Sequence, residues 1–241
     1  MTSVPVDASR RRQYPIYLLL DVSASMRQRS GSTTPQAAFT ALLPDLIMKL
    51  ADAPALASTA WLSVIAFSDA PQLLSPMTPL ARPAHVREPD PGQQTDYVAA
   101  LRYLGEQIAE DMRRIEQHGQ TGRYHTVVAH PLVFVITDGA PYRDGDYQPP
   151  HAWLTHRDRL VAAPTCARIA AIGLVGAHPP TLRALATGTR LERNAFIADR
   201  DADAESLARS VINVIERSIK VSVRIGEMVI DEPDGMRRIN G

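Results

Sequence analysis

Two adjoining stretches decide the fold of this chain: Tyr14-Pro-Ile-Tyr-Leu-Leu-Leu20 and, directly after it, Asp21-Val-Ser23-Ala-Ser25. A short apolar run of this kind is typical of a buried strand in a parallel sheet. Alternate residues of an extended or turning segment can point the same way, so one carboxylate and two hydroxyls would converge on one point. We therefore expect a polar site at the carboxyl end of this strand.

Strands and helices alternate along the rest of the chain. Five further segments have the apolar character of strands: 61–67, 72–80, 132–137, 169–175 and 194–198. Five segments have the character of helices, with one apolar face or helix-start signals: 34–50, 96–117, 153–168, 181–187 and 203–219. Such alternation predicts a mostly parallel sheet with helices on both faces. We predict a single Rossmann-like α/β domain over residues 13–219 with a six-stranded sheet.

The remaining segments are predicted to be irregular. Residues 1–12 are expected to form a flexible arm, and residues 118–130 and 141–150 are expected to be loops. Residues 220–241 are expected to form a tail in which 221–225 alternates like a strand. Pro44 lies inside the first predicted helix, where it should produce a kink.

Composition excludes several classes of function. Lys plus Arg and Asp plus Glu both number 26, so no basic field indicates nucleic acid or an anionic membrane as a partner. A single cysteine excludes an internal disulfide, and no zinc-ligand spacing occurs. The sequence has neither the apolar run of a signal peptide nor that of a membrane span. We therefore expect a soluble protein of the cytoplasm.

Five oxygen-bearing side chains are candidates for a metal site. Asp21, Ser23 and Ser25 follow the first strand, and Thr95 opens the helix that starts near residue 96. Asp138 follows another buried strand and would accept hydrogen bonds from metal-bound waters. Mg²⁺ prefers oxygen ligands and keeps several waters, and Mn²⁺ or Ca²⁺ are alternatives. So few formal charges would leave the cation able to bind a carboxylate from a partner protein.

The order of these residues resembles the von Willebrand factor type A (VWA) domain family. That family has a D-x-S-x-S motif after its first strand, like Asp21-Val-Ser-Ala-Ser25, a later Thr, like Thr95, and a turn like Thr137-Asp138-Gly139. Phe67-Ser68-Asp69 is similar to the turn after its second strand. The resemblance covers roughly residues 13–219 and implies a MIDAS (metal-ion-dependent adhesion site) and a protein-binding, non-enzymatic role.

Within the family, the sequence is similar to compact bacterial proteins of the TerY type. Matching segments are Pro15-Ile-Tyr-Leu-Leu-Leu-Asp21 and Pro131-Leu-Val-Phe, followed by Thr137-Asp-Gly-Ala-Pro141. This resemblance implies tellurite-resistance or stress signalling with a Ser/Thr kinase or a PPM-type phosphatase as partner. The sequence departs from the pattern at Gln93-Gln94, where small glycines are usual, and at Asp96, whose charge could compete for the metal or repel an acidic ligand.

Other interpretations of the same residues remain open. Asp21 and Asp138 also suit strand-end turns, and Thr95 also suits the N-cap of a helix. A metal-dependent phosphatase of the haloacid dehalogenase type also follows a strand with Asp, but its D-x-D motif has a second acid where this chain has Ser23. A scaffold with an empty metal site is the third alternative.

Overall fold

A central sheet of eight strands organises this chain in the computed structural model, which describes residues 10–119, 125–189, 192–199 and 202–239. The strands of this sheet are β1 (Arg10–Asp21), β2 (Ala60–Phe67), β3 (Pro71–Pro79), β4 (His125–Val128), β5 (Leu132–Thr137), β8 (Arg168–Gly173), β9 (Ala195–Ala198) and β10 (Met236–Arg238). The short strands β6 (Tyr142–Arg143) and β7 (Asp146–Tyr147) form a separate hairpin. The helices are η1 (Ser25–Arg27), α1 (Pro35–Ala51), α2 (Pro54–Ala57), α3 (Tyr97–Gly119), α4 (Pro150–Val161), α5 (Pro179–Leu185) and α6 (Ala204–Ile225).

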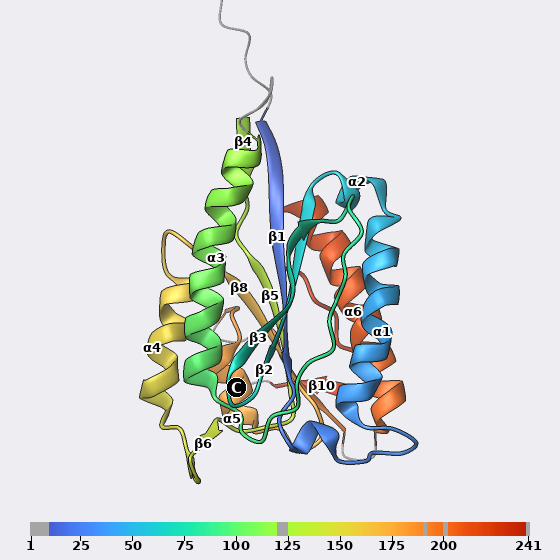
Figure 1. The fold of residues 1–241 in the computed structure, drawn as a ribbon, viewed down its shortest axis with the longest axis vertical. Coiled ribbons are helices and arrows are strands. Elements are labelled where there is room, and N and C mark those ends of the chain that lie inside the picture. Colours follow the sequence, from blue (N-terminus) through green and yellow to red (C-terminus); the bar gives the residue numbers. More distant parts are fainter. Residues whose placement is uncertain (1–9, 120–124, 190–191, 200–201, 240–241) are drawn as a thin grey trace, which may run out of the picture.

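Strand β1 lies at the switch point of the sheet, where successive strands along the chain are added first on one side of β1 and then on the other. The sheet order is β10-β9-β8-β5-β1-β2-β3, and β4 pairs with the first half of β1. All pairs are parallel except β2 with β3 and β9 with β10. In open α/β sheets, ligands bind beyond the carboxyl ends of strands at such a switch point. This edge is the lower one in Figure 1, where β1 leads into η1.

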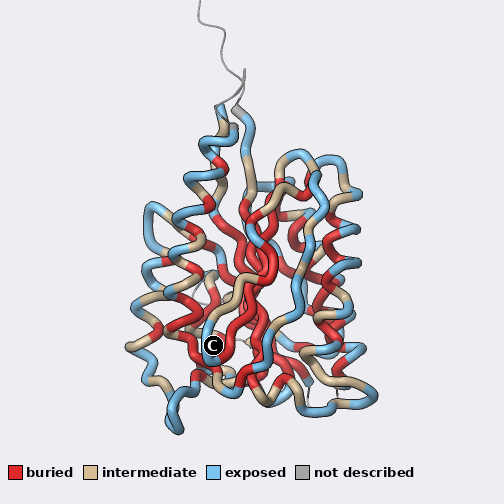
Figure 2. The backbone as a smooth tube through the Cα atoms, viewed as in Figure 1, coloured by how far each residue is buried: buried red, intermediate tan, exposed pale blue. Residues whose placement is uncertain are grey.

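Helices cover both faces of the sheet, as predicted (Figure 1). Leu18 and Leu20 pack into the core beneath α1 and α6, whereas Tyr17 and Leu19 pack beneath α3, α4 and α5. This division follows from the two-residue period of a strand, which sends neighbouring side chains to opposite faces. Both faces of the central strands are therefore buried, which explains their uninterrupted apolar runs (Figure 2).

The predicted number of strands was wrong, because two short strands were missed. Strand β4 lies in the predicted 118–130 loop and pairs with Arg10–Gln13, a segment that includes the end of the predicted flexible arm. Residues 1–9 and 120–124 lie outside the described part of the chain. Strand β10 lies in the predicted tail and pairs antiparallel with β9. Both strands are short and partly polar, so their pairing depends on the neighbouring strand.

Two helix predictions also need correction. Helix α6 continues to Ile225 and ends at Gly226 in the left-handed conformation, so residues 221–225 are not a strand. Helix α4 starts at Pro150 and ends at Val161, well before the predicted residue 168. Helix α1 continues through Pro44 to Ala51. Within the described residues, none of these helices is both long and apolar enough to cross a membrane.

Candidate metal centre

Asp21 lies at the centre of the carboxyl edge of the sheet and is completely buried. Because Leu20 of β1 pairs with Ile136 of β5, Asp21 lies level with Thr137. The Thr137 hydroxyl donates a hydrogen bond to Asp21 Oδ2 over 2.6 Å, and the Ser23 N–H donates to Asp21 Oδ1 over 2.9 Å. Both carboxylate oxygens are thus oriented by the ends of two neighbouring strands.

The two serines and Asp138 form a chain of oxygen atoms beside Asp21. The hydroxyl oxygens of Ser23 and Ser25 are 3.2 Å apart, and the Ser25 hydroxyl donates to Asp138 Oδ1 over 2.7 Å. Ser23 and Asp138 are buried, whereas Ser25 is half-buried. The structure therefore brings together four of the five predicted residues, and Asp138 is more than a hundred positions from the other three in the sequence.

Gly139 shows that Thr95 belongs to the same cluster. A Cβ atom placed on Gly139 would lie 2.9 Å from Thr95 Oγ1 and 3.5 Å from Asp21 Oδ2. Glycine thus keeps open a small space that the Thr95 hydroxyl and the Asp21 carboxylate both border. A space that a single side-chain carbon would fill, lined by hard oxygen donors, fits a small cation of the Mg²⁺ class.

A Gly139→Ala variant is expected to weaken divalent-cation binding by roughly tenfold or more, because the new methyl group displaces Thr95 or fills the space itself. Calorimetric titration with Mn²⁺ measures the effect. Gly105→Ala is the matched control, because Gly105 lies in α3 and the nearest atom to a Cβ placed on it is Leu160 Cδ2 at 3.4 Å, an ordinary contact. Equal Mn²⁺ affinity in Gly139→Ala and wild type would mean that this space is not the binding site.

The sequence suggested that the Asp96 charge could compete for the metal, but in the structure both Asp96 oxygens are engaged elsewhere. Its side chain accepts a hydrogen bond from the Ala99 N–H over 2.9 Å, so Asp96 caps α3. Its other oxygen pairs with the Arg143 guanidinium. Thr95, for which an N-cap role was the alternative, is thereby not needed as the cap and its hydroxyl remains at the edge.

Hydrogen bonds from Arg27 and to Asp69 hold the loop that precedes Thr95. Arg27 donates to the carbonyl oxygens of Gly92 over 2.6 Å and Val22 over 3.1 Å, which ties this loop to the end of β1. Asp69 accepts hydrogen bonds from the Gln93 and Gln94 N–H groups. The glycine that allows this close approach is Gly92, which precedes Gln93-Gln94.

A Gly92→Ala variant is expected to lower the free energy of unfolding by about 1–3 kcal/mol, because its Cβ would overlap the Ser68 side chain and lie 2.7 Å from Asp69 Oδ2. Urea denaturation followed by circular dichroism measures this loss. An unchanged unfolding midpoint would contradict the requirement for glycine here.

Burial makes the two carboxylates of the cluster hard to ionise. Desolvation raises the pKa of Asp21 to about 7, and the neighbouring Asp138 charge adds to this effect, although hydrogen bonds from Thr137 and Ser23 oppose it. Desolvation also raises the pKa of Asp138, opposed by the Ser25 hydrogen bond. Among the described residues, no positively charged side chain pairs with these two buried acids, and a divalent cation would supply that charge.

The sequence profile of the von Willebrand factor type A domain matches residues 16–140, which is more than half of the chain. This chain belongs to the VWA domain family. The match contains Asp21, Ser23, Ser25, Thr95 and Asp138. VWA domains generally serve as adhesion or interaction modules rather than as enzymes. No curated protein matches the chain at a significant level.

Solved structures share the fold of this VWA domain. Proximal thread matrix protein 1 from the mussel byssus has a TM-score of 0.53 and 17% identity, with 85% of this chain and 48% of that chain covered. Another structure of that mussel protein has a zinc-occupied MIDAS motif. The pilus adhesin SpaC from Lactobacillus rhamnosus GG has a TM-score of 0.57 and 12% identity, with 89% and 31% covered. This VWA domain thus spans less than half the length of either protein.

Several residues that shape the VWA site were not identified from the sequence. The role of Thr137 in orienting Asp21 depends on strand register, and the role of Gly92 depends on where a distant turn lies. Arg143 and Gln148, which contact Asp96, come from a segment predicted to be a loop. The Asp144-Gly145 turn, with both residues at positive φ, was the available signal for a hairpin in this segment.

Proposed function

We propose that this VWA domain holds a divalent cation at the edge of the sheet and binds an acidic side chain of a partner protein through it. Asp21, Ser23, Ser25 and Thr95 would ligate the cation, and Asp138 would hold its waters. Mg²⁺ is the expected ion, with Mn²⁺ or Ca²⁺ as alternatives. The bound cation supplies an electrophilic centre that attracts an Asp or Glu carboxylate.

The clustering of these oxygen atoms at one edge of the sheet carries the proposal: Ser23, Ser25 and Asp138 are linked by hydrogen bonds, and Thr95 and Asp21 both border Gly139. A hollow of about 380 Å³ is lined by Ser25, Asp138 and Gly176, so a side chain from outside can reach these two members of the cluster. Asp21 is the single carboxylate among the four proposed direct ligands, so a divalent cation would keep positive charge and coordination positions for the acid of a partner. The zinc-occupied MIDAS motif of the mussel protein supports a divalent cation as the ligand.

The non-enzymatic role is the better supported of the two main alternatives. A phosphatase of the D-x-D type needs a carboxylic acid two residues after Asp21 as a proton donor, and this chain has Ser23 there. The Ser23 hydroxyl lies 3.2 Å from that of Ser25, in an arrangement suited to metal ligation. The family also favours an interaction module.

We further propose a TerY-like role in the cytoplasm, within a stress or tellurite-resistance system whose partner is a Ser/Thr kinase or a PPM-type phosphatase. The support is the set of segments that match this subgroup, in particular Pro15-Ile-Tyr-Leu-Leu-Leu-Asp21 and Thr137-Asp-Gly-Ala-Pro141. Measuring whether a purified PPM-type phosphatase binds this protein only with Mg²⁺ tests this finer assignment, and binding that is the same with and without Mg²⁺ would contradict it.

Calorimetry with Mg²⁺ and Mn²⁺ tests the metal site on wild type, Ser23→Ala and the control Ser32→Ala, whose serine is exposed. We expect saturable binding of one ion in wild type and the control, and its loss in Ser23→Ala. No binding in wild type would favour an empty scaffold. Metal-dependent release of phosphate that disappears in Asp21→Asn would instead establish the hydrolase alternative.

A further inference from the structure

The β6–β7 hairpin is joined directly to the residue that would be the fourth metal ligand. Thr95 and Tyr142 form an isolated antiparallel bridge in which each N–H donates to the carbonyl of the other over 3.0 Å. Tyr142 starts β6 and lies only four residues after Asp138. The hairpin thus links the Thr95 loop to the turn that contains Asp138.

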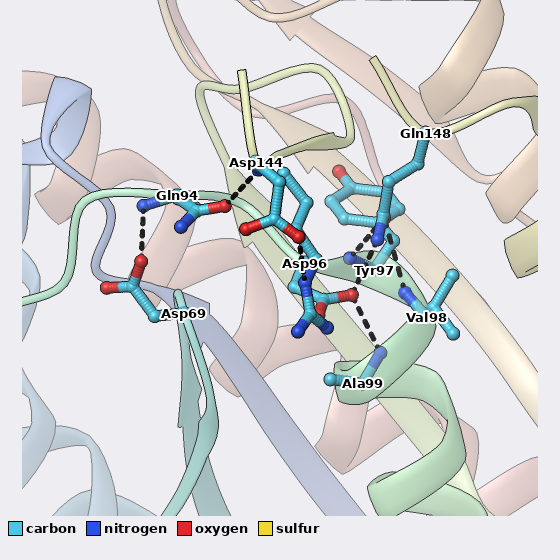
Figure 3. Close-up of polar contacts among 9 residues, drawn as sticks. Asp69, Gln94, Asp96, Tyr97, Val98, Ala99, Asp144 and Gln148 are labelled. Atoms are coloured by element: carbon cyan, nitrogen blue, oxygen red, sulfur yellow. Dashed lines mark hydrogen bonds and ion pairs between the residues drawn. The ribbon is translucent and has the colours of Figure 1, made fainter. Parts of the chain in front are cut away.

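Asp96 is the second point of attachment for the hairpin (Figure 3). Its side chain is fully buried, its Oδ1 accepts from Gln148 Nε2 over 2.7 Å, and its Oδ2 pairs with Arg143. A buried carboxylate is strongly destabilising without a partner, so these contacts offset the cost of burying the Asp96 charge. Because Asp96 is covalently bonded to Thr95, whatever fixes Asp96 restricts Thr95 as well.

Two more contacts extend this attachment along the chain in both directions from Thr95. Before it, Gln94 Oε1 accepts from the Asp144 N–H over 2.6 Å, and after it, Gln148 Oε1 accepts from the Tyr97 N–H over 2.9 Å. Figure 3 shows Gln94 reaching Asp144 and Gln148 lying over the start of α3. The hairpin therefore contacts the residues on both sides of Thr95 and the Thr95 backbone itself.

We propose that the β6–β7 hairpin positions Thr95 for the cation, and that Arg143 and Gln148 are positioning residues which set the affinity of the metal site. This inference rests on the proposed metal-binding function. The loop that contains Gln93 and Gln94 is held from outside by the hairpin through the Gln94–Asp144 hydrogen bond and the Thr95–Tyr142 bridge. Partners that hold a ligand in place commonly change metal affinity when they are removed.

The experiment compares wild type with Arg143→Ala, with the Arg143→Ala/Gln148→Ala double variant and with Arg217→Ala. Arg217 is the matched control, because it is an exposed arginine paired with Asp231 away from the hairpin. Amide hydrogen exchange is measured by NMR on the metal-free proteins at Thr95, Tyr142 and the β5 residue Val135. Mn²⁺ affinity is measured by calorimetry on the same samples.

We expect the Thr95 and Tyr142 amides of the double variant to exchange at least roughly tenfold faster relative to Val135, and Mn²⁺ affinity to fall by about tenfold. An Arg143→Lys variant should keep more Mn²⁺ affinity than Arg143→Ala, because lysine retains a positive charge near Asp96. The proposal would be overturned if, in the double variant, the Thr95 and Tyr142 exchange rates rose no more than that of Val135. It would also be overturned if the Mn²⁺ affinity of the double variant equalled that of Arg217→Ala. If wild type binds no Mn²⁺, the proposed function fails, while the exchange data still decide whether the hairpin holds Thr95.

Discussion

An Asp21→Asn variant is expected to lose divalent-cation binding, with Mn²⁺ affinity reduced by at least roughly a hundredfold, yet to be no less stable than wild type without metal at pH 8. The carboxylate is completely buried beside Asp138, so its charge costs free energy in the metal-free protein. Asparagine keeps an oxygen to accept the Ser23 N–H and removes that charge. Loss of the ligand and relief of a buried charge should therefore occur together.

Calorimetry with Mn²⁺ and thermal unfolding in the presence of a chelator measure the two effects of Asp21→Asn. Asp158→Asn is the control, because Asp158 is exposed on α4 and, within the described part of the chain, pairs with the neighbouring Arg157. The control should keep wild-type affinity and stability. A variant at Asp21 that binds Mn²⁺ as wild type does would show that this carboxylate is not a ligand.

The stability of the metal-free domain is expected to fall as pH rises from about 4 to about 7. The folded-state pKa of Asp21 is about 7, above its ordinary value of 3.8, because burial disfavours the charged form. The folded state therefore binds a proton that the unfolded state has released, so the stabilisation is complete below pH 4 and lost by about pH 7. The pKa difference corresponds to a loss on the order of 4 kcal/mol at most.

Urea denaturation at a series of pH values, with chelator or with saturating Mg²⁺, measures this dependence. We expect Mg²⁺ to reduce the fall, because the cation stabilises the ionised carboxylate and binds more tightly as the proton leaves. Asp21→Asn should show a smaller fall with chelator. A stability that rises between pH 4 and 7 in the metal-free wild type would contradict the raised pKa.

The fold was predictable wherever a segment's own pattern determined its structure. The apolar runs of β1, β2 and β5 are buried on both faces and need no context to be recognised. Strand β4 is four partly exposed residues whose structure comes from pairing with β1, so its own sequence carried little signal. The segment 221–225 alternates over too few residues to separate a strand from the end of a helix.

The proximity of the candidate residues was predictable from the sequence, but the geometry of their contacts was not. Motif order was sufficient to select Asp21, Thr95 and Asp138, and the structure places them at one edge. The partners of Asp96 were not predictable, since Arg143 and Gln148 lie about fifty residues away and reach it only through the hairpin fold. A local pattern does not encode contacts that depend on the position of a distant turn.

A crystal structure of wild type grown with Mn²⁺ tests the central claim most directly, because the anomalous signal of the ion locates it. We predict a single strong peak within about 2–2.5 Å of oxygen atoms of Asp21, Ser23 and Ser25, with Thr95 completing the set. Absence of a peak at this edge, or a peak bound only elsewhere on the domain, would contradict the account.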